Sequence, residues 1–160
     1  MQQFSNALAK LEEMFIAVGI LVPAVVLFAN VVLRYFFNSG WVWAEELARY
    51  LIVWTVFVGA SCCVRLGMHL AVDAFVIRLT ARRQHLVKIV VSAICVAFSL
   101  FLVVYGWDIC SMLRDTEQIT PGLEMPVYYA YMAMPVGGLL MGFRFMEEIV
   151  RNIKALSTFR

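Results

Sequence analysis

Four apolar stretches without charged residues divide the chain, at residues 14–33, 50–64, 89–107 and 125–143. A helix needs about 20 residues to cross the hydrocarbon core of a membrane. The second stretch has only 15 residues, so its helix must begin earlier and carry charged residues in its first turns. The pattern predicts an all-α membrane protein with four transmembrane helices. Residues 1–160 form a single membrane domain, with spans at about 14–37, 44–64, 86–107 and 126–148.

The positive charges predict how these spans are oriented. Of the thirteen Lys and Arg residues, one precedes the first span, five lie at residues 65–88 and four lie at residues 144–160. With four spans, these three segments share one side of the membrane. Since Lys and Arg are in excess on the cytoplasmic side, we expect both termini to be cytoplasmic.

Two further stretches show apolar residues at helical spacing, at residues 4–14 and 70–79. Residues 4–14 are expected to form a cytoplasmic amphipathic segment that leads into the first span. The spacing at residues 70–79 is typical of a short amphipathic helix that lies in the inner membrane interface. For residues 70–79, a simple extension of the second span fits equally well.

The composition requires lipid around the chain. Hydrophobic residues make up 63% and charged residues 15%, whereas soluble domains have about 25% charged residues. The net charge of +2 and the lack of a long basic run give no reason to expect nucleic acid as a partner. The four cysteines form no C-x-x-C pair, and we expect no metal or other cofactor in this chain.

A charged cluster stands at the beginning of the second span. Glu45 and Arg49 are four residues apart, and Glu46 and Arg49 are three apart, so either carboxylate could pair with the guanidinium on one helix. Which glutamate pairs within the chain, and whether one reaches across to a neighbour, stays open. Trp43 and Trp54 provide amphipathic rings that set the depth of the span.

The other end of the second span carries a similar set. Arg65, His69 and Asp73 follow one another at four-residue steps. Together, the two sets of charges are expected to fix the span at both ends.

Small residues mark two helix-packing surfaces. Gly138 and Gly142 form a G-x-x-x-G motif in the fourth span, and Gly59 lies in a small-residue patch of the second. Such residues allow another helix to approach closely.

The centres of the four spans hold no ionisable residue, although an ion-coupled carrier normally keeps such a group near the middle of the membrane. We therefore expect no catalytic, substrate-binding or metal-binding residue in this chain. An alternative is a membrane anchor for a haem- or quinone-associated redox enzyme. His69 and His85, the only histidines, lie outside the apolar windows, which disfavours haem ligation.

The segment 30–73 resembles the small membrane subunit of tripartite ATP-independent periplasmic (TRAP) transporters, and residues 121–145 are similar to the last span of that family. The residues that carry the resemblance are Arg34, Trp43, Glu45, Glu46, Arg49, Trp54, Gly59, Arg65, His69 and Asp73.

This resemblance implies a non-catalytic scaffold subunit in the bacterial inner membrane. Its partners would be a large elevator-type membrane subunit, which binds sodium ions and substrate, and a periplasmic binding protein that docks transiently. The substrate would be a carboxylate of the C4-dicarboxylate or sialic acid type. Membrane lipids would surround the chain, and spans one and two would meet the large subunit.

Overall fold

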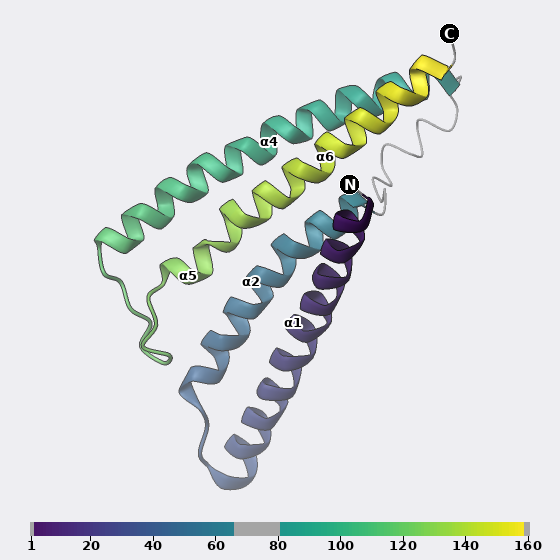
Figure 1. Ribbon diagram of the computed structural model, residues 1–160. Coiled ribbons are helices and arrows are strands. Elements are labelled where there is room, and N and C mark those ends of the chain that lie inside the picture. Colours follow the sequence, from purple (N-terminus) through teal and green to yellow (C-terminus); the bar gives the residue numbers. More distant parts are fainter. Residues whose placement is uncertain (1, 66–80, 159–160) are drawn as a thin grey trace.

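The computed structural model describes residues 2–65 and 81–158, which are helical apart from the connecting turns (Figure 1). The helices are α1 (Gln2–Phe37), α2 (Val42–Arg65), α4 (Ala81–Asp115), α5 (Tyr128–Tyr131) and α6 (Ala133–Thr158). The predicted all-α fold class is confirmed. The amphipathic stretch at residues 70–79 lies outside the described residues.

Three of the described helices, α1, α2 and α4, are long and apolar enough to cross a membrane. With 36 and 35 residues, α1 and α4 are each more than about 50 Å long at 1.5 Å per residue. They exceed the hydrocarbon thickness of about 30 Å, so their ends reach beyond it. Charged residues occur in those ends, which is why the apolar windows were shorter than the helices.

The fourth predicted span is built from two helices. The helical path turns at Met132, between α5 and α6. Pro135 explains this turn, because proline offers no N–H to the carbonyl four residues earlier and its ring crowds that carbonyl. Within α6, only residues 133–143 precede the first charge, Arg144. This is why α6 is not counted with α1, α2 and α4 among the described helices that are apolar enough to cross a membrane.

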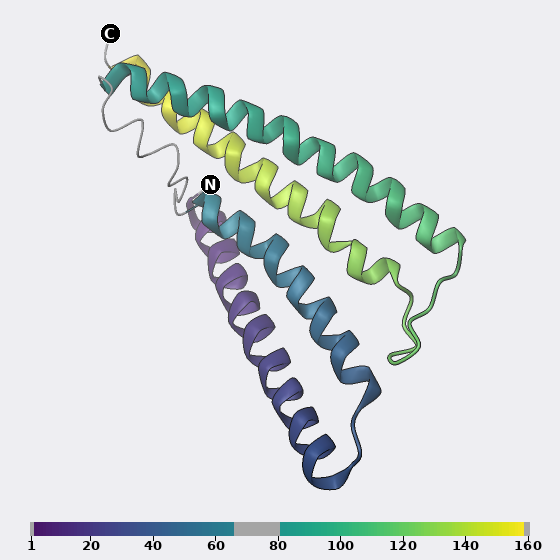
Figure 2. The same cartoon turned by 180° about the vertical axis from the view of Figure 1, so that it is seen from behind.

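The helices form two hairpins, α1 with α2 and α4 with α6 (Figures 1 and 2). Contacts between α2 and α6 connect the two hairpins, so the packing order is α1, α2, α6, α4. In both views the hairpins spread apart toward the α1–α2 turn and the loop that follows α4. The molecule is therefore a fan of helices with little enclosed core, and long apolar faces remain exposed on α1 and α4.

Glycines allow the close approach of α6 to its neighbours. A Cβ atom at Gly138 would lie 3.0 Å from the carbonyl oxygen of Ser99 in α4, and one at Gly142 would lie 3.5 Å from the Cβ of Ser99. Gly137 faces the opposite way, against Phe57 of α2. Two adjacent glycines thus bring α6 close both to α4, its hairpin partner, and to α2 of the other hairpin.

Candidate functional site

The first turns of α2 are tied to the loop between α4 and α5 through Glu46. Its carboxylate accepts backbone hydrogen bonds from Gly122, at 3.0 and 3.1 Å, and from Leu123, at 2.9 Å. Hydrogen bonds to a charged acceptor are stronger than those between neutral groups. A single side chain therefore holds the loop against the start of α2.

Gly122 is required at this contact. A Cβ atom there would lie 2.9 Å from Oε2 of Glu46 and 3.1 Å from Cα of Trp43. The loop is narrowed by an antiparallel bridge between Ile119 and Pro126, and the Pro121–Gly122 turn lies at its tip. The Pro121–Gly122 turn thus places the backbone N–H groups of Gly122 and Leu123 against the Glu46 carboxylate. Gly122 is 76 residues away from Glu46 in the sequence.

The pairing of the glutamates with Arg49 is not formed among the described residues. Glu46 is engaged by the loop, and Glu45 is exposed. Glu45 and Arg34 line one surface pocket of about 390 Å³ at the α1–α2 turn, without a direct ion pair between them. The charged cluster is divided between a loop contact and an open surface.

Tryptophans connect the start and the middle of α2 to its neighbours. Trp54 donates its indole N–H to the carbonyl oxygen of Tyr129 at 3.0 Å. The backbone N–H of Trp41 donates to Oδ1 of Asn30 at 2.6 Å, and the Trp41 and Trp43 rings stack with centroids 5.3 Å apart. These contacts join α2 to α1 and to α5.

At the other end of α2, Arg65 forms an ion pair with Glu13 of α1. His69 and Asp73, the two remaining members of that set, lie outside the described residues. A Cβ atom added at Gly59 would meet no atom of another described helix within 4 Å, so Gly59 itself does not serve helix packing inside this part of the chain.

A buried ion pair joins the two hairpins, and the sequence did not indicate it. Glu12 and Arg144 pair at 3.2 Å, with side chains only 3% and 2% exposed. Ser61 donates to the other oxygen of Glu12 at 2.8 Å, and Arg144 also pairs with Glu147 at 3.2 Å. The only signal was that Arg144 directly follows one apolar window and Glu12 lies two residues before another; charged residues at such positions usually remain exposed.

The described residues contain no group of three or more His, Cys, Asp or Glu side chains that could hold a metal ion. His85 shares a hydrogen bond between Nδ1 and Oδ1 of Asn152 at 2.8 Å. It is thus engaged in holding α4 against α6.

Comparison with known proteins decides the family. Residues 24–155 match the family described as tripartite ATP-independent periplasmic transporters, DctQ component. The chain belongs to this family. It is a component of a transporter rather than an enzyme, and a multi-pass protein of the inner membrane.

Individual relatives agree with this assignment. The C4-dicarboxylate TRAP transporter small permease protein DctQ of Vibrio cholerae is 30% identical over 91% of this chain and 71% of its own length. The ectoine TRAP transporter small permease protein TeaB of Halomonas elongata is 26% identical over 95% and 79%. The isethionate TRAP transporter permease protein DctMQ of Oleidesulfovibrio alaskensis is 24% identical over 91% of this chain, but over only 24% of itself.

Proposed function

We propose that this chain is the non-catalytic scaffold subunit of a sodium-coupled TRAP transporter. It pairs with a large elevator-type membrane subunit, which carries the sodium and substrate sites, and a periplasmic binding protein delivers the substrate. The observation that carries the proposal is the family match combined with the absence of ionisable residues from the centres of the apolar windows. A subunit that moved ions itself would need such groups.

The relative named DctMQ supports the pairing. The part similar to this chain makes up only 24% of that relative, which therefore carries a much longer region in addition. We assign the role of such a large permease region to the partner of the present chain. The fan of helices suits this role, since its exposed apolar faces offer surface for a large neighbour as well as for lipid.

The proposal includes a topology. Helices α5 and α6 together form a fourth span, and the Lys and Arg distribution puts both termini in the cytoplasm. The Glu46 contact and the loop after α4 would then lie on the periplasmic side, where the binding protein docks.

The substrate class rests on relatives alone. Relatives are named for C4-dicarboxylate, ectoine, isethionate and sialic acid, all small and charged. We propose a small carboxylate, of the C4-dicarboxylate or sialic acid type, as substrate.

Affinity purification of the tagged full chain from its native membrane tests the pairing. We expect a large multi-span protein to co-purify in equal amount. Gly59→Leu should reduce its recovery, because Gly59 faces no described residue of its own chain and the second span is proposed to meet the partner. Ala97→Leu is the matched control, since Ala97 is exposed on α4. Purification of the wild-type chain without a large partner would contradict the proposal.

A further inference from the structure

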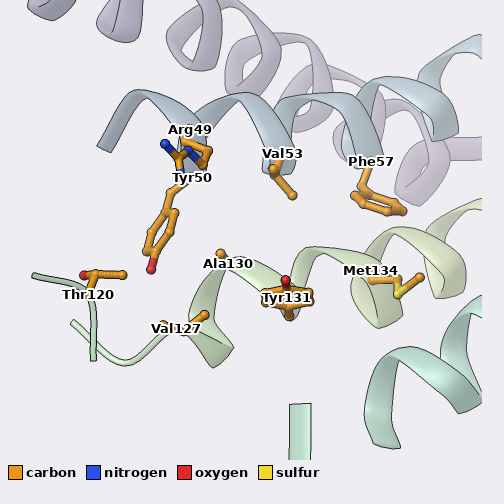
Figure 3. A pocket seen from close by; sticks show the side chains of 9 residues that line it. All are labelled: Arg49, Tyr50, Val53, Phe57, Thr120, Val127, Ala130, Tyr131 and Met134. Atoms are coloured by element: carbon orange, nitrogen blue, oxygen red, sulfur yellow. The ribbon is translucent and has the colours of Figure 1, made fainter. Parts of the chain in front are cut away.

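A groove runs between α2 and the segment that leads from the α4–α5 loop into α6 (Figure 3). It has a volume of about 470 Å³. Its lining residues are Arg49, Tyr50, Val53, Phe57, Thr120, Val127, Ala130, Tyr131 and Met134.

The groove is polar at one end and apolar along its length. Arg49, Tyr50 and Thr120 lie at the end near the α4–α5 loop, while Val53, Phe57 and Met134 line the part further along α2 (Figure 3). From residue 49 to residue 57, α2 rises by about 12 Å. The groove thus extends from the membrane interface, marked by the tryptophans at the start of α2, into the hydrocarbon region.

Two polar groups at the interfacial end have no partner within the described structure. Arg49 is exposed and forms neither an ion pair nor a hydrogen bond with the described residues. The hydroxyl oxygen of Tyr50 is fully buried and also lacks a hydrogen-bond partner there; it points across the groove toward Thr120 (Figure 3). The exposed guanidinium of Arg49 has no counter-charge among the described residues, so this end of the groove is suited to an anionic ligand that accepts charge-assisted hydrogen bonds.

We propose that this groove binds one glycerophospholipid. The phosphate pairs with Arg49, and one acyl chain lies along Val53, Phe57 and Met134. The single charged end and the apolar remainder match a lipid whose anionic phosphate lies at the interface and one of whose two acyl chains enters the groove. The bound lipid fills the space between the hairpins and stabilises their separation at this end.

Native mass spectrometry of the full chain tests the site, with dioleoylphosphatidylglycerol titrated onto delipidated protein. We expect one lipid to bind tightly, and Arg49→Gln to weaken it about tenfold, as loss of one charge-assisted contact implies. Arg34→Gln is the matched control, because Arg34 lies near the same end of the hairpin but outside the groove. Dioleoylglycerol, which has the same chains without phosphate, should bind at least tenfold more weakly.

Two further variants separate lipid binding from misfolding and from a protein ligand. Val53→Trp fills the apolar part and should abolish the tight site while circular dichroism shows unchanged helix content. A photo-crosslinking amino acid at Val53 in whole cells should yield an adduct with the mass of one phospholipid. Equal lipid affinity of Arg49→Gln and wild type, equal affinity for dioleoylglycerol, or a crosslink to a second protein chain instead of lipid would overturn the proposal.

Discussion

At the scale of single residues, Glu46 is the side chain that holds the α4–α5 loop against the start of α2. It accepts three hydrogen-bond contacts from two consecutive backbone N–H groups. Spacing within the helix favoured Arg49 as the partner, because three- and four-residue separations are the only contacts that a sequence reveals directly. The actual partners depend on the position of a loop 76 residues away, which sequence spacing does not report.

Glu46→Gln should loosen this loop. A neutral amide accepts weaker hydrogen bonds, and its NH₂ group cannot accept from a backbone N–H. We expect amide hydrogen exchange in peptides covering residues 118–127 to become roughly tenfold faster, which corresponds to about 1.4 kcal/mol. Hydrogen-exchange mass spectrometry provides the measurement.

Glu45→Gln is the control for this experiment, because Glu45 is exposed and has no contact with the loop. Its exchange rates should equal those of the wild type. Unchanged exchange in Glu46→Gln, or an equal change in both variants, would show that the carboxylate does not hold the loop.

At the scale of helices, the Glu12–Arg144 ion pair joins α1 of one hairpin to α6 of the other. Both side chains are almost completely buried, and Ser61 brings α2 into the same cluster. A charge buried without its partner is strongly destabilising, whereas replacing both partners with apolar residues is often neutral. The pair therefore links α1 to α6 past α2, which lies between them in the packing order.

A double-mutant cycle tests this arrangement. Glu12→Leu and Arg144→Met should each lower the free energy of unfolding by about 3–5 kcal/mol. The double variant should recover a large part of that loss, since neither charge is then left alone. Unfolding in mixed detergent micelles, followed by circular dichroism, measures all four proteins. Strictly additive losses would argue against a direct pair.

At the scale of the whole molecule, the apolar windows predicted the helices because lipid demands long runs of apolar residues. The expected second span at 44–64 lies within α2. As predicted, this helix begins before the apolar window and carries charged residues in its first turns. The turn at Met132 was not predicted, although Pro135 was its visible cause. The fan arrangement and the Glu12–Arg144 pair could not be predicted from the sequence either. In a membrane protein, apolar residues face lipid as well as other helices, so the sequence pattern does not indicate which helix faces pack together.

Cysteine labelling tests the proposed topology of this fan. In a variant whose four native cysteines are replaced, Glu117→Cys should react with a membrane-impermeant maleimide in spheroplasts. Lys154→Cys should react only after the membrane is permeabilised, because the Lys and Arg distribution predicts a cytoplasmic C-terminus. Equal labelling of both positions in intact spheroplasts would show that α5 and α6 do not cross the membrane.

The central claim is that this chain supports transport without performing it. Sodium-gradient-driven uptake into proteoliposomes tests that claim most directly, with the ligand of the periplasmic binding protein as labelled substrate. Vesicles with this chain alone should take up no more substrate than protein-free vesicles, and uptake should begin once the large subunit and the loaded binding protein are added. Sodium-dependent uptake by the chain alone would contradict the account.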